Sequence, residues 1–216
     1  MKKITAFYPL FLLTLLSMSF VCMTCKKQPP QEKAYYRFTQ ADHLRLLPYT
    51  KGQVLKFTNQ DNKERTFTIQ SVNSDTIQLV HNGFLGVINL FRYDDKIITL
   101  VDNETTKWFR IHFSRLPIEY DLAKQETYTE YPSKFYASIQ SIPFWNGGTI
   151  QIDYEQVKTE MTIHGKTYRN VFVLTSGNES IIDNNGHIRD VNVMYYDEIE
   201  GIIGFDDLNG NEWRLK

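Results

Sequence analysis

The chain has 216 residues, with 24 Lys and Arg against 25 Asp and Glu, so its formal net charge is −1. A near-neutral chain without a basic stripe lacks the electrostatic footprint of a nucleic-acid-binding protein, and we expect no nucleic-acid partner. The length allows one substantial core, or two small lobes, without disulfide staples.

The N-terminus carries a targeting pattern. Lys2 and Lys3 precede residues 4–24, which are uncharged and mostly apolar, and Cys25 follows directly. A basic start before an apolar run predicts a secretory signal. The order resembles the signal peptide of bacterial lipoproteins. This resemblance implies removal of residues 1–24, acylation of Cys25 as the new N-terminus, and a lipid-anchored location in the bacterial cell envelope, at the outer membrane.

Alternatives to this processing stay open. The apolar run is about as long as the roughly 20 residues that span a bilayer, so an uncleaved anchor competes, as does an ordinary cleaved signal. Cys22 is the second candidate for lipidation, but the small Thr24 and the polar stretch after Cys25 favour Cys25. Residues 25–34 are polar and contain two prolines, which predicts a semi-extended tether.

Residues 35–216 are predicted to be a β-rich domain. Aromatic residues make up 14% of the chain, and Tyr and Phe favour strands. Alternating runs at residues 54–58 and 66–69 flank a polar loop and predict a hairpin, as do residues 97–101 and 108–113. Three more hairpins are expected in the C-terminal third: 160–163 with 168–174, 180–182 with 191–196, and 201–205 with 213–215.

These elements predict an all-β fold, an antiparallel sandwich or a full or half barrel, with few short helices. The best helix candidates are residues 40–46 and 119–124. If the domain has two lobes, their seam lies near residues 114–143. The apolar residues expected to face the core are Leu55, Phe57, Phe67, Ile69, Val171, Val173, Ile203 and Phe205.

The C-terminal third carries a second resemblance. Residues 168–171 (YRNV), 193–196 (VMYY) and 201–205 (GIIGF), followed by 213–215 (WRL), are similar to the tails of uncharacterised β-rich lipoproteins of Gram-negative bacteria. This resemblance implies adjacent antiparallel strands with glycine at the bend. It implies no catalytic residue, because that family has no settled activity.

A search for chemistry finds no catalytic motif. None of the five histidines lies within four residues of another, and the chain lacks HExxH, GxSxG, SxxK and glycine-rich phosphate loops. Residues 206–212 are rich in oxygen ligands but fail the calcium-loop template, so we interpret them as a polar hairpin turn. We therefore predict no catalytic residue, metal or cofactor, although an enzyme is not ruled out by sequence.

Phe144 and Trp145, just before Gly147 and Gly148, are the best candidates for a ligand-binding tip, although aromatic residues of β proteins more often lie in the core. The favoured function is a non-enzymatic binding or structural module held on the membrane by its lipid, with a glycan, a lipid or an envelope protein as partner. One alternative is a carrier or chaperone for an apolar ligand in a barrel cavity. The other is a glycan-acting enzyme with facing carboxylates in a cleft.

Overall fold

A computed structural model of the chain describes residues 34–83, 86–118, 131–140, 149–175 and 191–216. The chain divides into two compact units, Met1–Glu32 and Lys33–Lys216, and the described residues all belong to the second. The structure is nearly all β, with 65% strand and 3% helix, which confirms the predicted fold class. Within the described part of the chain, no helical segment has the length and apolarity needed to cross a membrane.

The described elements follow one another along the chain in this order: β1 (Tyr35–Tyr36), α2 (Gln40–His43), β2 (Val54–Thr58), β3 (Glu64–Gly83), β4 (Gly86–Asp102), β5 (Trp108–Pro117), β6 (Ser133–Gln140), β7 (Thr149–Gln151), β8 (Thr159–Ile163), β9 (Lys166–Thr175), β10 (Val191–Asp197), β11 (Gly201–Asp207) and β12 (Glu212–Leu215).

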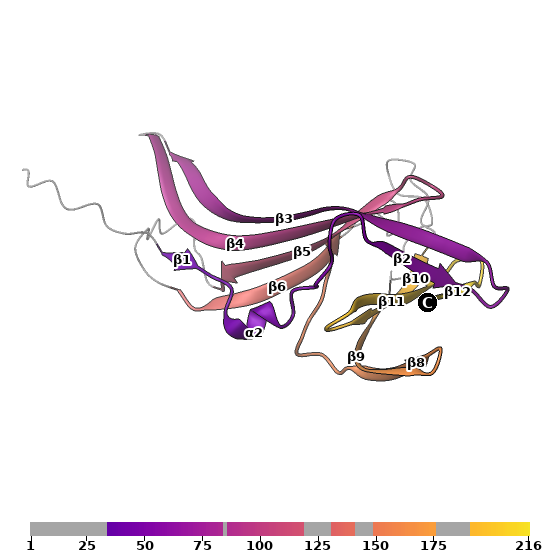
Figure 1. The fold of residues 1–216 in the computed structure, drawn as a ribbon. Helices are drawn as coiled ribbons and strands as arrows, with labels where there is room; N and C mark the ends of the chain where they lie inside the picture. The colour runs from indigo at the N-terminus through magenta and orange to yellow at the C-terminus, as the bar shows by residue number, and fades with distance from the viewer. Residues whose placement is uncertain (1–33, 84–85, 119–130, 141–148, 176–190) are drawn as a thin grey trace, which may run out of the picture. The chain divides into compact units, whose positions relative to one another are not determined.

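One curled antiparallel sheet, a half-barrel, contains eleven of these strands. Their order is β7-β6-β5-β4-β3-β2-β12-β11-β10-β9-β8, and the short β1 pairs in parallel with β4. Every neighbouring pair on this path is adjacent in sequence except β2 with β12, which joins the N-terminal hairpins to the C-terminal ones. Figure 1 shows β3 and β4 as the longest strands of the sheet.

The local hairpin predictions are largely confirmed. β2 pairs with β3, β4 with β5, β8 with β9, and β11 with β12. The helix predicted over residues 40–46 is present but ends at His43. The strand predicted at 180–182 and the helix predicted at 119–124 lie outside the described residues. β10 pairs with β9 in the structure.

Aromatic side chains fill the core on one face of the sheet. Phe57 lies 5.6 Å from Phe67 and 5.3 Å from Phe205, measured between ring centroids, and both contacts are edge-on. The main hydrophobic cluster extends from β2 to β6 and on through β9 to β12, and it includes Leu47 and Tyr49 from the segment after α2. The core face of the half-barrel is therefore occupied by the protein's own side chains.

Val173 is a correction to the predicted core, because it is 44% exposed whereas the other seven predicted core residues are buried. Both faces of the sheet around β9 are covered. Phe172 belongs to the main cluster, and Val171 packs with Ile163 and Ile203 in a second cluster on the opposite face. Val173 shares the side of Val171 but lies beyond this second cluster, so alternation alone misplaced it.

Tyr49 fixes the segment after α2 onto β11. Its hydroxyl donates to the carbonyl of Glu200 at 2.8 Å and accepts from the N–H of Ile202 at 3.2 Å. Gly201 between them has φ +81, and a Cβ there would lie 2.3 Å from the hydroxyl oxygen of Tyr49. Glycine is thus required for this contact, which holds α2 and the residues after it in place over the sheet.

Candidate functional site

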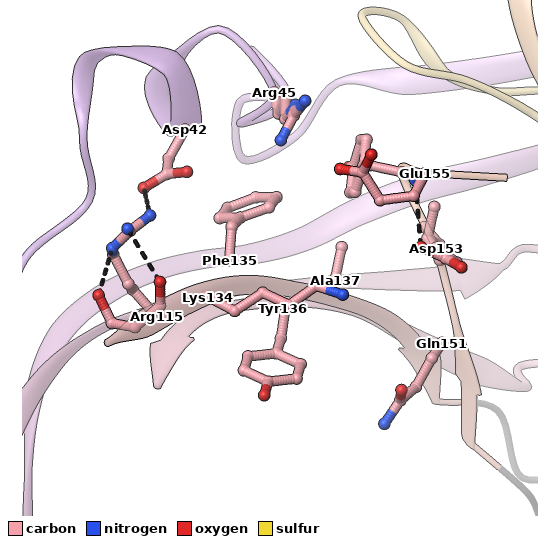
Figure 2. A pocket seen from close by; sticks show the side chains of 13 residues that line it. Asp42, Arg45, Arg115, Lys134, Phe135, Tyr136, Ala137, Gln151, Asp153 and Glu155 are labelled. Carbon is pink, nitrogen blue, oxygen red and sulfur yellow. Dashed lines mark hydrogen bonds and ion pairs between the residues drawn. The ribbon is translucent and has the colours of Figure 1, made fainter. Parts of the chain in front are cut away.

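The sequence-predicted site residues Cys25, Phe144 and Trp145 lie outside the described residues. The described part of the chain offers a different candidate, a pocket of about 360 Å³ beside α2. Its lining comes from four segments, namely Asp42 and Arg45, residue 115 of β5, residues 133–137 of β6, and residues 151–155 at and after the end of β7 (Figure 2).

One wall of the pocket is a satisfied ion pair. Thr39 caps α2 and its N–H donates to Asp42 Oδ2 at 2.7 Å, while Arg115 donates to the same oxygen at 2.7 Å. Arg115 also donates to the hydroxyl of Ser133 at 3.0 Å. Asp42 is 3% exposed, so its charge is offset by these donors within the protein. Asp42 and Arg115 therefore form a wall of the pocket, and their charges are already paired within the protein.

The guanidinium of Arg45 uses only part of its hydrogen-bond donors within the described residues. Its Nε donates to Glu198 Oε1 at 3.1 Å, and its guanidinium carbon lies 4.6 Å from the ring centroid of Tyr154. Lys158 donates to the other oxygen of Glu198 at 2.6 Å. The two terminal amino groups of Arg45 have no hydrogen-bond partner among the described residues, and Figure 2 shows the guanidinium turned toward the pocket. Arg45 is therefore oriented and still able to bind an anionic group.

The floor of the pocket is an open edge of β6. Ile118 N–H donates to the carbonyl of Pro132, on the β5 side, and Ile152 N–H donates to the carbonyl of Ala137, on the β7 side. Because backbone groups alternate between the two edges of a strand, the N–H and C=O of Phe135 and the N–H of Ala137 also point away from β5.

Within the described part of the chain, the N–H and C=O of Phe135 and the N–H of Ala137 have no hydrogen-bond partner. β7 pairs with residues 138–140 of β6. Beyond that pairing, described residues bond to this edge at two places, Ile152 N–H to the carbonyl of Ala137 and Arg115 to the carbonyl of Ser133 at 3.2 Å. Residues 133–137 all line the pocket. Phe135 and Ala137 are 7% and 2% exposed, so their side chains are in the core while their free backbone groups face the cavity. An unpaired buried backbone group is costly, so water or a ligand must satisfy it.

Three exposed apolar residues are sequence neighbours of the ion network of Arg45, Lys158 and Glu198. Leu44, Val157 and Ile199 are 75%, 95% and 60% exposed. Exposed apolar side chains of this kind are typical of binding surfaces.

Tyr154 adds a buried hydroxyl beside the pocket. Burial, reinforced by the charge of Glu198, raises the pKa of Tyr154 far above its usual value, so the phenol stays protonated. Its hydroxyl and that of Tyr196 are buried without a hydrogen-bond partner in the described structure. Tyr154 therefore contributes a neutral aromatic wall and not a base.

A second cavity, of about 560 Å³, lies beside β4 and includes Asp94, Asp95 and Lys96. Its polar groups are largely hydrogen-bonded to other groups of the protein. Asp94 accepts from the hydroxyl of Tyr35 at 2.7 Å and from the N–H of Phe38 at 2.8 Å. Lys96 donates to the carbonyl of Leu47 at 2.9 Å, and burial lowers the pKa of Lys96.

The nearest approach to catalytic geometry is the pair of Asp95 and His112, whose side chains hydrogen-bond. Ser138 lies opposite His112 in the register of β5 and β6, but the described residues give the imidazole no bond from a hydroxyl, only one from Gln140 at 3.4 Å. A nucleophile held against a base is therefore not assembled. Across the described ranges, no three His, Cys, Asp or Glu side chains gather as metal ligands do.

Comparison with protein-family models, with curated proteins and with solved structures finds no match to the chain. The resemblance of its two ends to bacterial lipoproteins stays a prediction.

Proposed function

We propose that the chain is a membrane-anchored lipoprotein of the bacterial cell envelope that acts as a non-enzymatic binding module. The pocket between α2, β6 and residues 151–155 is its binding site. The observation that carries this proposal is a set of polar groups in one cavity that have no partner among the described residues, namely the N–H and C=O of Phe135, the N–H of Ala137 and the terminal amino groups of Arg45. The anchor rests on the pattern that ends at Cys25.

The packing of the core favours a surface module over a carrier of apolar ligands. A carrier needs an apolar cavity, whereas the core face of the half-barrel is filled by the main cluster and the two cavities described above are lined by charged residues. A glycan-acting enzyme needs two facing carboxylates, one of them free to move a proton. Three carboxylates line the pocket, those of Asp42, Asp153 and Glu155. Asp42 is held by Arg115 and by its own helix cap, and Asp153 accepts from the N–H of Glu155 at 3.1 Å.

The test compares variants in a binding screen. The full chain is expressed in a Gram-negative bacterium, purified from the cell fraction that contains it, and screened against envelope glycans, lipids and peptides. We expect Arg45→Gln to weaken binding at least tenfold. Arg110→Gln is the matched control, because Arg110 also lies over an aromatic ring, at 4.7 Å from that of Trp108, but on β5 away from the pocket.

Two outcomes would contradict the proposal. Equal binding by both arginine variants, with loss in Trp145→Ala, would move the site to the tip predicted at Phe144 and Trp145. Turnover of a glycan or an ester by the purified protein would show that it is an enzyme.

A further inference from the structure

We infer that the partner at this pocket is an extended peptide segment of another protein, which adds a strand to the open edge of β6 and places an acidic side chain on Arg45. This inference rests on the proposed function and names its class of ligand. It follows from the kind of groups that are left unpaired, from their spacing, and from the charge and the apolar side chains around them.

The unpaired groups at the floor are main-chain groups at strand spacing. The N–H and C=O of Phe135 and the N–H of Ala137 lie on one edge, two residues apart, which is the pattern that a neighbouring strand satisfies. Strand addition to an exposed sheet edge is a common mode of peptide recognition, in which main-chain bonds give affinity and side-chain pockets give specificity. A sugar or a phosphate does not require this alternation.

The place of the added strand is defined by β7. β7 occupies the same edge over residues 138–140, and the chain leaves that edge after Ile152. A peptide that follows Ile152 along residues 134–136 would continue the line of β7 for about 10 Å, the length of three strand residues. Its main chain would fill the part of the pocket next to β6, and alternate side chains would point toward the α2 wall.

Arg45 determines which peptide side chain binds best at the α2 wall of the pocket. A guanidinium with two free amino groups binds a carboxylate through two parallel hydrogen bonds, a geometry that lysine does not offer. Glu198 already fixes the Nε end of Arg45, so little side-chain freedom is lost when the carboxylate arrives. Leu44, which precedes Arg45 in the sequence, is exposed and apolar and favours apolar residues beside that acidic one.

The first experiment selects the ligand. Eight-residue peptides displayed on phage are selected against the full chain, and a binding sequence is then synthesised with a fluorescent label. We expect an acidic residue at a fixed position with apolar residues near it. Arg45→Gln and Arg45→Lys should each raise the Kd of this peptide at least tenfold, and Arg110→Gln should leave it unchanged.

The second experiment tests strand addition directly. The same peptide is made with one N-methyl group at each backbone nitrogen in turn. Methylation at alternate positions, those whose N–H faces β6, should raise the Kd at least tenfold, while methylation at the positions between them should have little effect. In the protein, Ala137→Pro removes an outward N–H without breaking a bond to β5, as proline allows on a free edge, and should likewise weaken binding.

The outcomes separate the two proposals. Binding without the alternating methylation pattern overturns the inference, whether or not Ala137→Pro folds, because the modified peptides need no protein variant. If no peptide is selected but a glycan or lipid binds and is lost in Arg45→Gln, the proposed function stands and strand addition is wrong. If nothing binds at the pocket, both are wrong and solvent alone satisfies the edge.

Discussion

Replacing Asp102 with alanine should destabilise the fold far more than removing a surface charge. Arg65 donates to Asp102 Oδ2 from two nitrogens, at 2.6 and 3.2 Å, and the two side chains are 7% and 0% exposed. The guanidinium of Arg65 lies 5.3 Å from the ring centroid of Phe205, so it sits between the N-terminal hairpins and the C-terminal ones. Removing the carboxylate takes two charge-assisted hydrogen bonds from this buried cation, which costs about 3–5 kcal/mol.

Urea unfolding followed by circular dichroism measures this cost. Glu64→Ala is the control, because Glu64 pairs with Lys56 at 3.6 Å in an exposed pair and its loss should cost less than about 1 kcal/mol. The double variant Arg65→Met/Asp102→Leu should recover most of the loss, since an apolar pair needs no counter-charge. A loss below about 1 kcal/mol in Asp102→Ala would refute this reasoning, because the ion pair would then not govern the junction.

The pKa of Asp102 predicts how the stability of the fold changes in acid. Burial alone would raise the pKa of Asp102, but hydrogen bonds from Arg65, Thr105 and the N–H of Glu104 outweigh burial and lower the pKa below its usual value of 3.8. Because the unfolded chain then binds the proton more tightly, this stability is complete above about pH 4 and falls as the pH drops through the folded pKa. The urea midpoint of the wild type should therefore decrease below pH 4 more steeply than that of Asp102→Ala, and parallel curves would contradict this.

Three further predictions concern single residues. Gly201→Ala should destabilise by about 2 kcal/mol more than Gly165→Ala in urea unfolding, because both glycines have φ +81 but only Gly201 would place a Cβ against Tyr49, and equal losses would argue against that contact. Phe205→Ala, at 1% exposure, should cost roughly 3–5 kcal/mol in the same assay, and a cost below about 1 would show a core that closes over the gap. Cys25→Ser should move the protein from the membrane fraction to the soluble fraction, because acyl burial contributes about 0.8 kcal/mol per CH₂, and mass spectrometry of an unmodified mature N-terminus beyond residue 25 would disprove lipidation.

The hairpins could be predicted because their signals are local. Residues 54–58 and 201–205 show strand alternation next to polar turns, and both form strands with the next run along the chain. β3 pairs with β4 as far as Gly83, which lies opposite Gly86. Val173 was misplaced because burial on both faces of β9 depends on residues distant in sequence.

The candidate pocket could not be predicted, because it is made by long-range contacts. Asp42 meets Arg115 across 73 residues, and Arg45 meets Glu198 across 153. No local sequence pattern predicts either pair. The open edge of β6 depends on where the following chain leaves it, at Ile152, and a strand sequence reads the same whether or not its neighbour continues. Sequence reasoning favoured aromatic residues near glycines for binding, whereas the structure adds backbone groups, which carry no sequence signature.

The free edge of β8, at one end of the sheet path, differs from the edge of β6 in a way that bears on the proposed docking. β8 ends the path at one side, and its residues Thr159, Glu160 and Thr162 are exposed, with a register shift between Thr159 and Met161. Exposed charge and an irregular register discourage another strand from pairing, which protects an open edge from aggregation. β6 is regular where it is open, and its backbone groups lie within a pocket between α2 and residues 151–155. Lys134 on this strand is exposed, and Arg45 and Glu155 line the same pocket, so charge as well as the pocket walls discourages another sheet from pairing here.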